Sequence, residues 1–250
     1  MKRTVAVIIA ALAILGIVAA SLSAVGCGSS SVPSEAVATV GGTDITTAQF
    51  QELMTQAKAQ ATSQGMTWPA KGTATYNHYA AAIVDYLVQA SVVAKKAPSM
   101  GVTVTDKQVA DQVAAIEKQY GGTTKVTAIL KKQGMTMDLL KQSLRDRALA
   151  QGVAAKVVAS ATVTNAEIQA YWKAHAAQLS KQKATATLAK ATATIKTTLL
   201  NAAKQKLWSA WLAKQIRAIG VKYAAGYSPA TLTASPIASP SASASAASGG

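Results

Sequence analysis

Residues 101–122 read GVTVTDKQVADQVAAIEKQYGG, and this stretch decides the fold class. Thr105, followed three residues later by Gln108, forms a capping box, which is a start signal for a helix. The apolar residues behind it recur at helical spacing, at Val109, Val113, Ile116 and Tyr120. The two glycines that follow are a stop signal. The stretch therefore predicts one complete amphipathic helix with both of its ends marked.

The same start signal recurs on both sides of this stretch. Thr46 with Gln49 and Thr164 with Glu167 form two more capping boxes, and Thr136 precedes another apolar stripe. Helices are therefore expected over residues 46–65, 76–94, 105–120, 126–130, 136–157 and 164–179. Two short β-type runs, residues 37–40 and 221–223, are expected to pair and to bring the ends of the domain together. The predicted fold class is mainly α with this short β pairing.

Composition supports a helical protein and excludes several functional classes. Of the 250 residues 50% are hydrophobic, but only 5% are aromatic and 14% are charged. This excludes a wholly disordered chain and disfavours an all-β sandwich. The single cysteine excludes a disulfide framework and a cysteine-based zinc site, and no nucleophile elbow, Walker loop, zinc signature or dinucleotide fingerprint occurs. No cofactor and no metal are expected.

The first 34 residues have the layout of an export signal followed by a tether. Lys2 and Arg3 precede a long apolar run. Ala24-Val25-Gly26-Cys27 then resembles the bacterial lipobox, although Ala24 stands where that motif usually has leucine. The resemblance implies a lipoprotein signal peptide over residues 1–26, lipid attachment at Cys27, and an extracytoplasmic protein anchored to the cell membrane. Residues 27–34 are expected to be a flexible tether. An ordinary cleaved signal and an uncleaved anchor helix are the alternatives.

The C-terminal third is basic. The chain carries a formal net charge of +15, and after Glu167 there are ten Lys or Arg and no acid. Residues 180–227 are expected to form a long, poorly buried basic helix and a closing strand, and residues 228–250 a disordered Ser/Ala/Pro tail. Anionic lipids, wall polymers or acidic clients are possible partners of the basic face, and a merely solvated helix is the equal alternative. Its predicted polyanion-binding residues are Lys181, Lys183, Lys190 and Lys196. No nucleic acid partner is expected.

Five ordered motifs point to one family. They are the strand and turn of residues 37–42 with Ile45-Thr46, the helix start at residues 101–106, the L-x-x-x-G-x-T-x-x-x-L segment at residues 130–140, the V-T-x-x-E-I helix at residues 163–172, and a closing helix with Trp208 and Leu212 followed by the strand of residues 221–223. In this order they resemble the N-terminal chaperone region of the SurA/PrsA family of extracytoplasmic foldases. The resemblance implies a helical chaperone domain over residues 35–179, with residues 180–227 closing it, that binds unfolded or newly exported polypeptides without ATP. Many members also carry a parvulin prolyl-isomerase domain, but residues 180–206 are too few to form one.

No catalytic residue is predicted. Candidates for a client-binding groove are Tyr171, Trp172, Trp208 and Trp211, assisted by Met135 and Met137, and the alternative is that they simply form the core. His175 is interpreted as a packing histidine, because no carboxylate or nucleophile motif accompanies it. The preferred function is a membrane-anchored extracytoplasmic chaperone. The alternatives are a peptidyl-prolyl isomerase and a structural envelope protein that binds anionic wall polymers.

Overall fold

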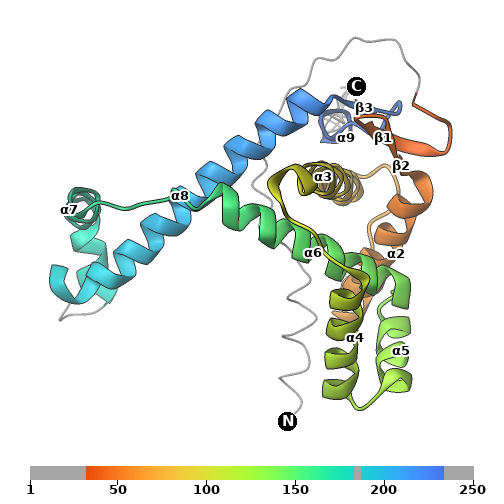
Figure 1. Ribbon diagram of the computed structural model, residues 1–250, viewed down its shortest axis with the longest axis horizontal. Helices are drawn as coiled ribbons and strands as arrows, with labels where there is room; N and C mark the ends of the chain where they lie inside the picture. The colour runs from red at the N-terminus through yellow and green to blue at the C-terminus, as the bar shows by residue number, and fades with distance from the viewer. Residues whose placement is uncertain (1–31, 183–186, 234–250) are drawn as a thin grey trace, which may run out of the picture. The chain divides into compact units, whose positions relative to one another are not determined.

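The computed structural model describes residues 32–182 and 187–233. This part of the chain is mainly helical with one small sheet, so the predicted fold class is confirmed (Figure 1). Its elements, in chain order, are β1 (Ala36–Val40), β2 (Thr43–Thr46), α2 (Thr47–Ser63), α3 (Ala74–Lys96), a 3-10 helix (Pro98–Met100), α4 (Asp106–Tyr120), α5 (Thr123–Lys132), α6 (Met137–Val157), α7 (Asn165–Gln182), α8 (Leu188–Ile219), β3 (Val221–Tyr223) and α9 (Pro229–Thr233).

The chain forms two compact units, which we describe separately. The terminal unit comprises residues 32–87 and 222–233, and the helical unit comprises residues 88–182 and 187–221. The division falls within α3, after Leu87, and within β3, after Val221.

The sheet of the terminal unit has the strand order β2-β1-β3. β1 and β2 are antiparallel, with Val40 opposite Thr43, and the turn between them is made by Gly41 and Gly42 at φ of 53° and 78°. Glycine reaches positive φ without steric penalty because it has no Cβ, so this turn favours glycine at both positions. On the other side of β1, the Ala224 amide donates to the Val37 carbonyl at 2.9 Å. The predicted pairing of the two β-type runs is therefore confirmed.

Helix α2 starts at the capping box predicted for Thr46. The Gln49 amide donates to the Thr46 hydroxyl at 3.1 Å, and the Thr46 amide donates to the Gln49 side-chain oxygen at 2.9 Å. The face that follows is buried, and the ring of Phe50 meets that of Tyr227 edge to face, with centroids 5.4 Å apart. The C-terminal end of the described chain thus packs on the first helix of the terminal unit.

One core of the helical unit lies among α4, α5 and α6. Thr105 with Gln108 caps α4, and Thr136 caps α6, as predicted. Between these helices lies a cluster of buried apolar side chains, made up of Val109, Val113, Val126, Leu130, Met135, Leu140 and Leu144. We call it the α4–α6 core. It buries the apolar stripes that the sequence predicted.

A second core joins the end of α3 to α6 and α8. Its fully enclosed members are Val93, Ala97 and Val153, and we call it the α3–α6 core. Val102 packs on its edge, so close to α6 that a Cβ placed on Gly152 would lie 2.6 Å from the Cγ1 of Val102.

The long basic helix expected from Ser180 begins later than predicted, at Leu188. Helix α7 continues to Gln182, and Thr187 adopts an extended backbone and caps α8 by accepting from the Lys190 amide at 3.4 Å. The helix is also better buried than predicted at one point, because Ile195 is only 2% exposed. The N-terminal end of α8 packs beside α7 (Figure 1), which buries apolar surface that an isolated helix would leave in water.

Helix α8 buries different faces in its two halves. Ile195 is buried in the half near α7, whereas Trp211 packs on the α3–α6 core in the other half. At about 100° per residue, Trp211 lies about 160° around the helix from Ile195. The helix therefore presents one side to α7 and nearly the opposite side to α6.

Candidate functional site

The aromatic pair Trp208 and Trp211 is the most prominent feature of the second half of α8. Their rings stack with centroids 5.2 Å apart and planes inclined by 21°. Both side chains are partly exposed and pack on the α3–α6 core, on which Leu149 of α6 also packs. Each indole thus has one part held by the core and another part open to solvent. The predicted core role and the predicted surface role are both compatible with this position.

Tyr171, Trp172 and His175 lie together on α7. The rings of Tyr171 and His175 stack at 4.1 Å, and His175 Nδ1 lies 2.8 Å from the Tyr171 carbonyl oxygen. A carbonyl only accepts, so this contact assigns the proton to Nδ1. All three side chains are partly buried. In this arrangement His175 packs on its own helix, as the sequence indicated.

Met135 and Met137 lie apart from the tryptophans, in the α4–α6 core. Met135 is 5% exposed, and Met137 is partly buried against the same cluster. The residues predicted to line one groove therefore occupy three places: the α4–α6 core, α7 and the edge of the α3–α6 core. Met135 is a core residue of the folded chain, so only Met137 of the two has surface to offer a ligand.

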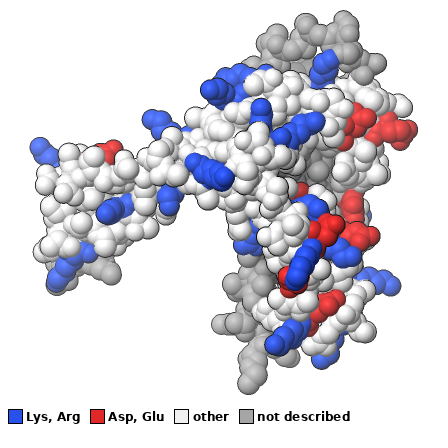
Figure 2. Space-filling view, in the orientation of Figure 1, with Lys and Arg blue, Asp and Glu red and all other residues white. Residues whose placement is uncertain are grey.

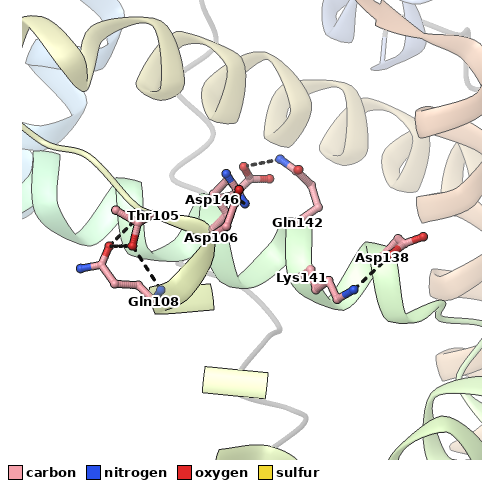
Figure 3. Close-up of polar contacts among 8 residues, drawn as sticks. Thr105, Asp106, Gln108, Asp138, Lys141, Gln142 and Asp146 are labelled. Atoms are coloured by element: carbon pink, nitrogen blue, oxygen red, sulfur yellow. Dashed lines mark hydrogen bonds and ion pairs between the residues drawn. The ribbon is translucent and has the colours of Figure 1, made fainter. Parts of the chain in front are cut away.

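A polar group links the start of α4 to α6 (Figure 3). Arg145 forms an ion pair with Asp106, and the Gln142 side-chain amide donates to Asp146 at 2.8 Å. Burial raises the pKa of the Asp146 carboxyl, while the Gln142 hydrogen bond and the Arg145 charge lower it in part. The Asp146 carboxyl contacts Gln142 and Arg145 of its own helix, and the ion pair of Arg145 with Asp106 joins α6 to the start of α4. We interpret this ion pair as a structural link.

The predicted lysines are placed only in part. Lys190 and Lys196 are exposed on α8. Lys183 and Cys27 lie outside the described residues, as does the side chain of Lys181.

The terminal unit also contains an aromatic cluster that the sequence did not predict. Trp68 packs on Tyr79 with centroids 4.9 Å apart and meets Tyr76 edge to face at 6.4 Å. Nearby in the chain, Met66 is 48% exposed. The available signal was a Trp-Pro pair in a glycine-bounded loop, followed by two tyrosines three residues apart. The helix predicted over residues 76–94 includes both tyrosines, but helical periodicity does not place Trp68 beside them.

The described residues contain neither a candidate metal site nor a candidate membrane-spanning helix. Among them, no group of three or more His, Cys, Asp or Glu side chains is placed to hold a metal ion. Within residues 32–182 and 187–233, none of the helices combines the length and the apolar character that crossing a bilayer requires.

Part of the chain matches a known protein family. Residues 1–154 match the family model described as the SurA-like N-terminal domain. The matched range includes β1 to α5 and most of α6, and it ends before α7 and α8. The search of curated proteins found no match. Trp208 and Trp211 therefore lie beyond the matched range.

Proposed function

Because the chain belongs to the SurA-like N-terminal domain family, we propose that it is a membrane-anchored extracytoplasmic chaperone. The family points to a chaperone-type function and to polypeptide substrates. In our proposal the protein holds unfolded, newly exported chains by reversible apolar contact. Such binding requires no ATP and no catalytic residue.

The observation that carries the proposal is the partly exposed tryptophan pair. Trp208 and Trp211 are stacked and rest on the α3–α6 core, so their rings are ordered before a client arrives. Large aromatic side chains contribute much apolar contact area, and little rotamer freedom remains to be lost when they are already packed. A preordered aromatic surface suits weak binding of many different apolar segments.

The anchor is a separate part of the proposal and rests on the sequence. We place the lipid on the Cys27 thiol, with residues 28–34 as the tether. Two acyl chains suffice for stable membrane attachment. Mass spectrometry of the protein from an expressing bacterium should show a diacylated N-terminal cysteine. The Cys27→Ser chain should lose that modification and leave the membrane fraction.

Aggregation suppression tests the chaperone activity. The chain from Gly28 onward, shown to be folded by circular dichroism, is mixed with a denatured client on dilution, and light scattering is followed without ATP. Suppression at equimolar or lower chaperone supports the proposal. No suppression with a panel of unrelated clients would refute it.

A pair of double variants localises the surface. Trp208→Ala with Trp211→Ala removes the stacked pair of α8, and Trp68→Ala with Tyr79→Ala removes the aromatic contact of the terminal unit as a matched control. We expect the first variant to lose most of the suppression and the control to retain it. Since the indoles also touch the core, the Trp208→Phe and Trp211→Phe variant should keep both fold and activity. Equal losses in both alanine variants would argue against the proposed surface.

A further inference from the structure

Four cationic side chains share one side of α8. They are exposed, and we call them the basic stripe: Lys196, Lys206, Lys214 and Arg217. At about 100° per residue they fall within a sector of about 80°, and they extend over about 32 Å of the helix axis. Their alignment is not visible in the linear sequence, because the intervals between them are ten, eight and three residues.

Two members of the basic stripe lie on the far side of α8 from Trp211, whereas Lys214 lies only about 60° around the helix from it. Lys206 and Arg217 are about 140° and 120° around the helix from Trp211. In this half of α8 the residues within the sector between the cations are Ala203 and Ala210, and Leu207 lies about 20° outside it, beside Lys214. The sector of the stripe therefore contains no large apolar side chain in the half that carries three of its four charges.

The cations of the stripe differ from those of α4 and α6. In those helices Lys107, Lys141 and Arg145 form ion pairs with Asp111, Asp138 and Asp106. Helix α8 contains no Asp or Glu, and no ion pair is recorded for the stripe in the described part of the chain. Figure 2 shows the same contrast, with Lys and Arg spread along α8 and with Asp and Glu gathered over other parts of the surface. Unpaired like charges repel one another, and an anion bound along them relieves that repulsion.

We propose that the basic stripe binds a linear polymer of phosphate groups laid along α8. A phosphate polymer carries charge at a short regular repeat, so it can meet cations spaced over the whole stripe. An unfolded acidic polypeptide carries its carboxylates irregularly. A membrane surface is less suited, because interfacial helices insert a face of several large apolar side chains, whereas Leu199 is the one large apolar residue within the sector of the stripe between Lys196 and Arg217. Arg217 adds a planar fork that matches phosphate oxygens. This binding is additional to the proposed chaperone activity and does not depend on it.

The test uses the full chain in a mild detergent and fluorescently labelled inorganic polyphosphate. Fluorescence anisotropy gives the dissociation constant over a series of salt concentrations. One variant neutralises the stripe by K196Q, K206Q, K214Q and R217Q. The matched control removes the same charge from exposed positions of α4 and α5 by K118Q, K125Q, K131Q and K132Q. Circular dichroism confirms that both variants are folded.

We expect the stripe variant to bind polyphosphate at least tenfold more weakly and the control to change by less than about threefold. Each contact to a flexible polyanion contributes about 0.7 to the slope of log affinity against log salt, so the slope should fall by about two to three. Equal weakening of both variants would show a response to net charge alone and would overturn the proposal. Two competitors test the choice of partner. If polyglutamate competes as well as polyphosphate at equal charge, the proposal is overturned in favour of an acidic peptide. If mixed micelles containing anionic phospholipid do so, it is overturned in favour of a membrane surface. Failure of the native chain to bind polyphosphate at low salt would refute it directly.

Discussion

Replacing Gly152 by alanine sets helix propensity against packing. Gly152 lies inside α6, where alanine is favoured over glycine by about 1 kcal/mol. Its missing Cβ would lie 2.6 Å from the Cγ1 of Val102, whereas carbon atoms in contact are about 3.5 to 4.0 Å apart. Because Val102 packs on the α3–α6 core, the methyl group cannot simply move away. Overpacking of this kind costs about 1 to 3 kcal/mol.

The packing effect should be the larger one. We expect Gly152→Ala to lower the free energy of unfolding by about 1 kcal/mol, with a range of about 0 to 2 once propensity is subtracted. Urea unfolding followed by circular dichroism measures this directly, and the slope of the transition should not change.

A second substitution separates the two effects. In a Val102→Ala background the close contact is absent, so adding Gly152→Ala should stabilise the chain by about 0.5 to 1 kcal/mol. The effect of the same substitution thus changes sign with its neighbour, and a double-mutant cycle measures the coupling. A Gly152→Ala chain that is more stable than the native chain by the full propensity difference would refute the reasoning.

Three further predictions concern a partly buried carboxyl, a helix cap and a core methionine. Burial raises the pKa of Asp85 to about 6, so the native state binds more protons than the unfolded chain between about pH 4 and 6, and stability falls as pH rises through that window. Asp85→Asn should abolish this fall and, after allowance for solvent screening, raise the free energy of unfolding by about 1 to 2 kcal/mol at pH 7. Urea midpoints of the native chain and the variant at about pH 4 and at about pH 7 measure both effects. Thr105→Ala should lower the free energy of unfolding by about 1 kcal/mol, whereas Thr123→Ala, at a helix start without a side-chain cap, should change it by less than half as much. Met135→Ala should lower the melting temperature by an amount equivalent to about 2 to 3 kcal/mol and Met137→Ala by clearly less, and equal effects would contradict the assignment of Met135 to the core.

Local chemistry explains why much of the fold was predictable. Capping boxes act over three residues, so Thr46 and Thr105 could be assigned as helix starts without knowledge of what the helices pack against. The strand pairing of residues 37–40 with 221–223 was a long-range prediction, and it is confirmed by the bond from Ala224 to Val37. Two short β-type runs at opposite ends of a helical chain had few other partners.

The candidate site was less predictable because it depends on which helices meet. Met135 and Trp208 were grouped by residue type, but they occupy different cores of the helical unit. The interruption before Leu188 was also missed, because a lone threonine cap resembles the other threonines of that stretch. The contact of Trp68 with Tyr79 depends on the path of a loop, which apolar periodicity does not report.

The change of buried side along α8 makes the middle of this helix sensitive to length. One residue inserted between Leu200 and Lys206 would turn the Trp211 half by about 100° relative to the Ile195 half and shift it by about 1.5 Å. Helix α8 could then keep its present contacts with α7 or with α6, but not with both at once. An insertion of seven residues, close to two full turns, would restore the angular phase to within about 20°. The number of residues in α8 therefore sets the rotation about the helix axis between the surface that contacts α7 and the surface that contacts α6.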